Sequence, residues 1–310
     1  MKKITIVSPC YNEEGNIKVF YEEVMANFPF HKYNFELLFI DNKSTDQTRA
    51  EILKVCFKDK RVKAIFNSAN FGQLKSPYYA LMQSDADATI LMVSDLQDPP
   101  NIIPKLISEW EAGFDSVMCT KTKSEESWFM YKVRTFYYNL VESLSESKQL
   151  KNFTGFGLYD KKIIEVLRIL KEPVPYFRGL VLEIGFQQSV IEYTQTNRKS
   201  GFTKNNFLSL FDVAILGICS SSRTPIRLIT ILGLFFCFFS FLASALYLIL
   251  KLFMWNEFPA GVAPLIIGGA IFASLQIFIL GMIGEYIGII LVKINDRPLV
   301  IEEKRINFNE

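Results

Sequence analysis

Two long apolar stretches constrain this chain more than any other feature of its sequence. Residues 228–250 form a run of 23 residues without a charge, and residues 258–284 form a second run of 27. As helices rising about 1.5 Å per residue, they would measure roughly 35 and 40 Å, which is enough to cross a bilayer core of about 30 Å. Because only residues 251–257 separate the two runs, we predict a two-helix transmembrane hairpin.

Basic residues flank the predicted hairpin on its two outer sides. Those before the first span are Arg198, Lys199, Lys204, Arg223 and Arg227, and those after the second are Lys293, Arg297, Lys304 and Arg305. The short turn between the spans contains one lysine and one glutamate. Since positively charged flanks stay on the cytoplasmic side, the pattern predicts that both termini and the bulk of the chain are cytoplasmic.

The composition excludes several kinds of site. The 34 Lys and Arg residues nearly balance the 32 Asp and Glu residues, which argues against a dedicated nucleic-acid binder. Five cysteines without a CxxC pair indicate neither a disulfide framework nor a zinc site. With His31 as its one histidine, the chain must carry out any chemistry on carboxylates, amides and basic groups.

Residues 1 to about 200 alternate short apolar runs with amphipathic stretches. The runs that fit buried strands are 4–8, 35–40, 62–66 and 89–93, and helical patterns include 13–27 and 45–56. This alternation predicts an α/β domain, in which a mostly parallel sheet carries helices on both faces. In such a sheet, ligands bind beyond the carboxyl ends of the strands.

Acids and amides follow three of these strands. They occur in residues 8–14, 41–46 and 94–100, so we expect them to converge on one rim of the sheet. No glycine-rich phosphate loop of the GxxxxGK[ST] or GxGxxG type is present. An acidic rim repels phosphates unless a divalent cation lies between them, and oxygen ligands suit Mg²⁺ or Mn²⁺.

Each of these segments also has a purely structural interpretation. Residues 41–46 could form a turn with a helix N-cap, and residues 12–14 could be acids in the first turn of a helix. Residues 98–100 could simply interrupt the chain before a helix that begins near Ile102. The sequence alone leaves these alternatives open.

Four motifs, in the order SPCYNEE, IDNKSTDQT, NFGQLKSPYYA and SDLQDPP, resemble those of the family-2 glycosyltransferases of the GT-A fold. Within that family the chain is similar to the polyprenyl-phosphate glycosyltransferases, which include the bactoprenol glucosyltransferases and, more distantly, the dolichol-phosphate mannose synthases. The resemblance covers essentially the whole chain. It implies a cytoplasmic GT-A (Rossmann-like) domain over residues 1–200, a basic juxtamembrane segment over 201–227, two transmembrane helices within 228–292 and a cytoplasmic tail over 293–310.

The resemblance also implies an activity. The protein would be an integral protein of the plasma (inner) membrane that moves a hexose, in the first place glucose, from a UDP-sugar to polyprenyl (undecaprenyl) phosphate. The transfer would invert the anomeric centre and require Mg²⁺ or Mn²⁺, and a homo-oligomer stays open. The alternatives are a non-catalytic scaffold or partner of a lipid-linked-sugar flippase and a processive polysaccharide synthase.

Individual residues receive roles from the same resemblance. Those expected to bind the nucleotide are Pro9, Tyr11, Glu13, Asp41, which would accept a hydrogen bond from the base, and Asn70. Those expected at the metal are Asp95 and Gln97. Those expected at the reacting groups are Asp95, Asp98 and four basic residues facing the acceptor phosphate, Arg134, Arg178, Arg198 and Lys204.

Three positions depart from the family pattern. Val93 stands where the first acid of the usual Asp-x-Asp motif is expected, which implies a thinner metal site. Asn42 and Lys43 replace the second Asp and the Gly of the usual Asp-Asp-Gly-Ser turn. Gly155 and Gly157 stand in a stretch where many relatives carry an Asp and an Arg.

Overall fold

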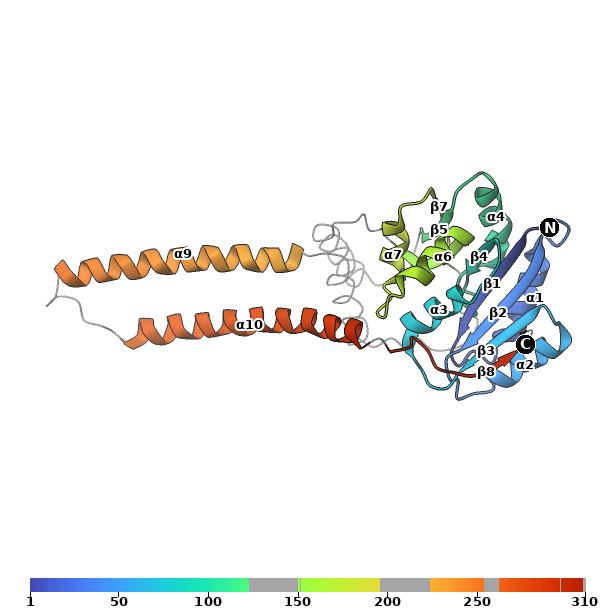
Figure 1. Ribbon diagram of the computed structural model, residues 1–310, viewed down its shortest axis with the longest axis horizontal. Coiled ribbons are helices and arrows are strands. Elements are labelled where there is room, and N and C mark those ends of the chain that lie inside the picture. Colours follow the sequence, from blue (N-terminus) through green and yellow to red (C-terminus); the bar gives the residue numbers. More distant parts are fainter. Residues whose placement is uncertain (123–149, 151, 196–223, 254–261, 296, 309–310) are drawn as a thin grey trace.

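A computed structural model describes residues 1–122, 150, 152–195, 224–253, 262–295 and 297–308. These residues form an α/β domain and two long helices that project from it side by side (Figure 1).

Eight strands form one sheet in the order β7-β5-β6-β4-β1-β2-β3-β8. The strands are β1 (Lys3–Cys10), β2 (Asn34–Asp41), β3 (Val62–Asn67), β4 (Ala88–Leu91), β5 (Ser116–Lys121), β6 (Phe153–Asp160), β7 (Gln188–Tyr193) and β8 (Glu302–Ile306). The described helices are α1 (Ile17–Asn27), α2 (Thr48–Lys58), α3 (Gly72–Met82), the 3₁₀ helix η1 (Pro100–Ile102), α4 (Ile103–Glu111), α6 (Lys161–Leu170), α7 (Phe177–Ile184), α9 (Thr224–Phe253) and α10 (Val262–Ile294).

The sheet is mixed, with a parallel centre. Strand β1 pairs in parallel with both β2 and β4, and β2 pairs in parallel with β3. Strand β6 is antiparallel to both β4 and β5. Since the chain extends the sheet from β1 first toward β3 and then in the opposite direction from β4, a crevice opens at the carboxyl ends of β1 and β4. The predicted α/β class and the largely parallel sheet are confirmed.

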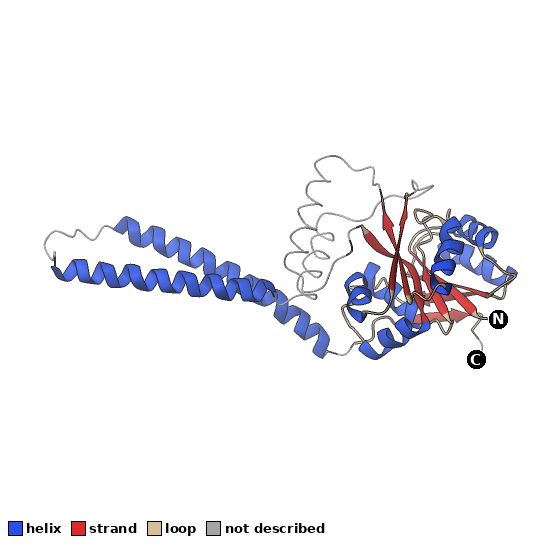
Figure 2. Ribbon diagram, turned by 90° about the horizontal axis from the view of Figure 1, so that it is seen from above, coloured by secondary structure: helices blue, strands red, loops and turns tan. Residues whose placement is uncertain are grey.

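Both faces of the central strands are buried, as their nearly continuous apolar sequences predict. Side chains such as Ile6 and Leu37 pack in one cluster with α1, α2 and α4. Their neighbours Val7 and Leu38 pack in a second cluster with α3, α6 and α7. Because successive residues of a strand point to opposite faces, each strand contributes to both clusters, with helices on either side of the sheet (Figure 2).

Two helices begin later than the sequence predicts. Helix α1 begins at Ile17 instead of residue 13, and α2 begins at Thr48 instead of residue 45. The residues in between form loops whose side chains and backbone bond to each other, and these contacts take the place of a first helical turn.

The predicted spans 228–250 and 258–284 fall within helices α9 and α10, which extend beyond them. Within the described residues, Ile271–Ile294 is apolar and long enough to cross a membrane, and none of its most apolar stretch is buried inside the protein. Ile229–Leu242 is a shorter apolar segment. The second apolar segment therefore continues past Glu285 to the end of α10, and the transmembrane hairpin itself stays a prediction.

The C-terminal segment returns to the sheet. We expected residues 293–310 to be a tail, but Glu302–Ile306 forms β8, which pairs antiparallel with β3 in the register Ala64↔Ile306. The backbone N–H of Ser68 also donates to the carbonyl of Ile301 at 2.9 Å. The chain that leaves α10 thus ends as an edge strand of the α/β domain.

Candidate functional site

The loops that follow β1 and β2 are bonded into one unit at the carboxyl end of the sheet. The backbone N–H of Asn12 donates to Ser44 Oγ at 2.9 Å, and the N–H of Thr45 donates to Asn12 Oδ1 at 2.8 Å. The backbone N–H of Glu13 donates to Thr48 Oγ1 at 2.7 Å. The motifs YNEE and DNKSTD therefore form a single wall of the site.

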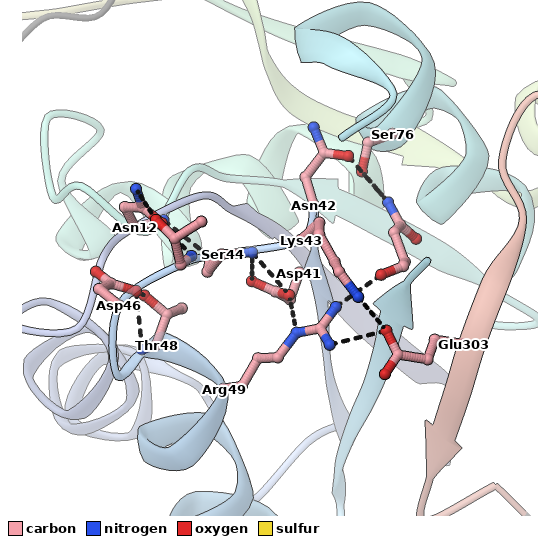
Figure 3. A network of polar contacts seen from close by, with 12 residues as sticks. Asn12, Asp41, Asn42, Lys43, Ser44, Asp46, Thr48, Arg49, Ser76 and Glu303 are labelled. Carbon is pink, nitrogen blue, oxygen red and sulfur yellow. Dashed lines mark hydrogen bonds and ion pairs between the residues drawn. The ribbon is translucent and has the colours of Figure 1, made fainter. Parts of the chain in front are cut away.

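Two acids of this wall serve the start of α2. The Glu14 carboxylate accepts the backbone N–H of Gln47 at 2.8 Å. The Asp46 carboxylate accepts the N–H of Thr48 at 3.0 Å and its hydroxyl at 2.5 Å (Figure 3). The first N–H groups of a helix lack intrahelical partners, so these carboxylates satisfy them and complement the helix dipole. The structural interpretation holds for both residues, although Glu14 serves α2 and not α1.

Asp41, the last residue of β2, is fully buried. Its carboxylate accepts a bond from Arg49 Nε at 2.5 Å and from the backbone N–H of Ser44 at 3.2 Å. Arg49, on α2, also donates through Nη2 to the carbonyl of Asn67 at 2.6 Å. The residue predicted to contact the base is thus held in place by an arginine, and a base could reach its carboxylate only after Arg49 or the loop moved.

Asn42, which replaces an acid of the usual motif, joins the loop after β2 to the loop before α3. Its amide nitrogen donates to Asn70 Oδ1 at 2.8 Å and to the carbonyl of Gly72 at 3.2 Å. Its amide oxygen accepts bonds from the Phe71 N–H at 2.9 Å and from Asn67 Nδ2 at 3.1 Å. Since a carboxylate cannot donate, asparagine is the residue that this buried position can use fully.

Three residues without glycine's freedom adopt left-handed backbone conformations at this edge. Asn12, Lys43 and Leu96 have φ of 56°, 63° and 60°, and they follow β1, β2 and β4 respectively. A left-handed conformation costs a non-glycine residue about 1–2 kcal/mol. Such strain gathers at functional sites, where surrounding contacts hold it. Lys43 therefore adopts the conformation for which the usual motif carries glycine.

The loop after β4 carries the predicted metal ligands. Asp95 is 8% exposed, and its carboxylate accepts the backbone N–H of Gln97 at 3.1 Å. The neighbouring Ser94 hydroxyl donates to the carbonyl of Pro9 at 3.5 Å, which joins this loop to the end of β1.

The donor set around Asp95 suits a divalent cation that is shared with a substrate. Within the described ranges, no three His, Cys, Asp or Glu residues are grouped so that they could hold a metal ion. Mg²⁺ is commonly bound by one or two carboxylates together with substrate phosphates. Asp95 and Gln97 supply hard oxygen atoms of this kind, so they fit such an ion.

Asp98 has a different environment. It is 4% exposed, and the Tyr193 hydroxyl at the end of β7 donates to its carboxylate at 2.5 Å. Burial raises the pKa of Asp98 to about 6, against the opposing effects of Tyr193 and Lys121. This is the geometry of a carboxyl that joins the loop after β4 to β7, and its predicted catalytic role stays untested.

The remaining predicted residues fall into two groups. Pro9, Tyr11 and Glu13 lie at the end of β1, half-buried, and the Glu13 carboxylate accepts a bond from Asn16 Nδ2 at 2.6 Å. Arg178 is half-buried on α7. The residues that lie outside the described part of the chain are Arg134, Arg198 and Lys204.

The two unusual glycines lie in β6. Gly157 pairs with Leu91 of β4 and Met118 of β5, and a Cβ built on it would lie 2.3 Å from the carbonyl oxygen of Val117. Gly155 has φ of +98°, which favours glycine. Both positions are therefore set by the close approach and twist of the strands.

Sequence reasoning missed Arg49 and Glu303. Glu303, on β8, accepts bonds from Lys43 Nζ at 2.8 Å and from Arg49 Nη1 at 3.0 Å. Lys43 and Arg49 lower the pKa of Glu303 to about 2, so it is charged at neutral pH. Its partners lie more than 250 positions away, and no periodic pattern connects them.

Comparisons with known proteins agree with this geometry. Residues 5–167 match the family described as Glycosyl transferase family 2. The SfII prophage-derived bactoprenol glucosyl transferase of Shigella flexneri is 32% identical over 97% of this chain and 98% of its own length. A prophage bactoprenol glucosyl transferase homolog of Escherichia coli strain K12 is 30% identical over 96% and 98% of the two chains.

Among solved structures, the fold is similar to that of glucosyl-3-phosphoglycerate synthase from Mycobacterium tuberculosis, a complex with Mn²⁺, UDP and phosphoglyceric acid. The TM-score is 0.51 at 15% identity, over 70% of this chain and 76% of the other. At this identity the likeness establishes the GT-A fold alone.

Proposed function

Because the chain belongs to glycosyl transferase family 2, we propose that this glycosyltransferase moves a hexose from a UDP-sugar to polyprenyl phosphate at a membrane surface. The observation that carries the proposal is the match to bactoprenol glucosyl transferases along 97% of the chain, which includes both long helices. Glucose is the sugar that these relatives' names favour.

The donor's nucleotide would bind at the crevice between the ends of β1 and β4. Pro9, Tyr11 and Glu13 line one side of it, and the wall formed with the loop after β2 closes that side. Asp95 and Gln97 would hold Mg²⁺ or Mn²⁺ on the diphosphate, where the cation neutralises charge on the leaving group. The Mn²⁺–UDP complex of the solved relative supports a divalent ion of this kind.

The acceptor's chemistry agrees with the residues available. A lipid phosphate is already anionic at neutral pH, so its attack on the sugar needs no strong general base, and a chain with one histidine is sufficient. The approach of two anions requires cations, which we assign to Arg134, Arg178, Arg198 and Lys204. Arginine pairs with phosphate through two parallel bonds. Direct displacement would invert the anomeric centre.

Helices α9 and α10 would anchor the domain in the plasma membrane, because a polyprenyl chain stays within the bilayer. The exposed apolar side chains of both helices support this assignment, among them Phe241 of α9 and Ile277 of α10. The return of residues 302–306 to the sheet supports a location of the C-terminus on the same side as the catalytic domain. Both would be cytoplasmic, where nucleotide sugars are made.

The test is sugar transfer by the purified full-length protein in vesicles that contain polyprenyl phosphate. With a panel of labelled nucleotide sugars, we expect label to enter the lipid phase from UDP-glucose, with release of UDP. Active preparations should lose transfer when the lipid phosphate is omitted. Failure to release a nucleoside diphosphate from any donor would favour the scaffold alternative.

A matched pair of variants tests the acceptor site. Arg198→Lys should raise the lipid-phosphate concentration needed for half-maximal transfer, because lysine lacks the paired donors of arginine. Arg223→Lys should be nearly silent if that residue serves only the orientation of the helices. Equal behaviour of the two variants would remove Arg198 from the acceptor site.

A further inference from the structure

The strand that follows the two long helices contributes a charged residue to the network around Asp41. Glu303 on β8 pairs with Lys43, in the loop after β2, and with Arg49 on α2, which in turn pairs with Asp41 (Figure 3). Two anions and two cations thus alternate along a continuous series of contacts. The series begins at a fully buried carboxylate and ends at one that is 46% exposed.

Each anion in this series has a distinct task. Asp41 by itself can balance only one of the two cations that lie between it and the surface. Glu303 balances the second, and it contacts Lys43 at the position where the backbone has φ of 63°. A group that holds both Lys43 and Arg49 restrains the two ends of the loop between them, whose Ser44 N–H also binds Asp41.

The position of Glu303 is fixed by the sheet. Strand β8 is bonded to β3, and Ser68 bonds to Ile301 just before the strand begins. The adjacent Glu302 has other partners: it accepts a bond from the Tyr79 hydroxyl at 2.8 Å and pairs with Arg305 at 2.5 Å. Two neighbouring glutamates on one strand therefore serve different neighbourhoods, and only Glu303 contacts the partners of Asp41.

We infer that Glu303 is a positioning residue for nucleotide recognition, acting through Arg49 on Asp41 from beyond the membrane helices. The inference rests on the proposed function, in which Asp41 recognises the base. Glu303 touches no substrate; it holds Arg49 and Lys43, and these hold the carboxylate and the loop in the arrangement that meets the nucleotide. The nucleotide site is then complete only when the segment after α10 has joined the sheet.

The competing explanation is that Glu303 only fastens an edge strand to the domain. Exposed ion pairs usually add little stability, about 0–1 kcal/mol, so such a fastening would change neither nucleotide affinity nor the choice of base. A positioning role would change both.

The experiment compares Glu303→Gln with Glu302→Gln in the full-length protein in detergent, by calorimetric titration with UDP, CDP and ADP in the presence of Mg²⁺. Melting temperatures should confirm that both variants are folded. We expect Glu303→Gln to weaken UDP binding about two- to five-fold, the range of a partly exposed ion pair, and to reduce the preference for UDP over the other two nucleotides. Glu302→Gln should match the wild type in both respects.

A second variant tests the route of the effect. In an Arg49→Gln background, Glu303→Gln should cause no further loss of UDP affinity, because the residue through which it acts is absent. Equal UDP affinity and equal base preference in Glu303→Gln, Glu302→Gln and wild type would overturn the inference. A wild-type protein that binds none of the three nucleotides would instead refute the proposed function, before any variant is compared.

Discussion

Replacing Asn42 by aspartate tests the network that joins the loop after β2 to the loop before α3. The substitution restores the residue type that the usual motif carries, and it changes only one group, the amide nitrogen to an oxygen. That nitrogen donates to Asn70 Oδ1 and to the carbonyl of Gly72. After the change, three oxygen atoms that cannot donate would face one another in a buried position. We therefore expect the family's usual residue to destabilise this protein.

The magnitude follows from the bonds involved. Two hydrogen bonds are lost at about 1 kcal/mol each, and leaving buried acceptors unpaired adds to this, so we expect a loss of about 2–4 kcal/mol. A flip of the Asn70 amide would offer a donor to the new carboxyl, but it would break the bond from the Gly72 N–H to Asn70 Oδ1 at 2.9 Å. For a domain of this size the loss corresponds to a decrease in melting temperature of about 4–16 °C.

The assay is thermal unfolding of the full-length protein between pH 4 and pH 8. Crowded by acceptors, the new carboxyl should have a raised pKa in the folded state. Its protonated form can donate, so the deficit should be small below about pH 4 and should grow as the pH rises through the folded-state pKa. Asn70→Asp is the stability control, since Asn70 uses its oxygen in both bonds and should lose little. Equal melting temperatures for Asn42→Asp and wild type at pH 7 would refute the assigned donor role.

Three further predictions concern the metal, a buried acid and the topology. Asp95→Asn should reduce sugar transfer about a hundred-fold or more without unfolding the protein, and a chelator should do the same to the wild type; full activity in excess chelator would contradict this. The raised pKa of Asp98, about 6, means that its contribution is complete below about pH 4 and is lost as the pH rises through 6, so urea unfolding should show Asp98→Asn gaining up to about 3 kcal/mol on the wild type between pH 4 and pH 7. In a background without the native cysteines, Asn256→Cys should react with an impermeant thiol reagent outside intact cells and Asn309→Cys should not; the reverse pattern would refute the topology.

Local patterns were sufficient for the centre of the fold. Residues 4–8 and 35–40 have uninterrupted apolar sequences because both of their faces are buried, and they lie within β1 and β2 as predicted. The rim of polar residues at the carboxyl ends followed from the parallel arrangement. The starts of α1 and α2 did not follow, because Asn12, Glu13 and Thr48 bond across two loops that are more than 30 positions apart in sequence.

Strand β8 could not be predicted, for a different physical reason. Its sequence, EEKRI, contains one apolar residue, as suits an exposed edge strand whose side chains meet solvent. Its pairing with β3 depends on contacts across some 240 residues, and no pattern within five residues encodes such a partner. The ion pairs of Glu303 with Lys43 and Arg49 were inaccessible for the same reason. The role of Asn42 was missed because a departure from a motif does not reveal what the new side chain contacts.

The position of β8 at the end of the chain determines the order in which the sheet is completed during synthesis. Every other strand of the sheet is translated before the two long helices, and β8 is translated after them. Until then β3 presents a row of unpaired N–H and C=O groups, the kind of open edge that promotes association between chains. A nascent polypeptide interrupted at any codon before residue 302 would keep that edge open. Closure of the sheet therefore reports to the cell that the ribosome has finished the whole protein.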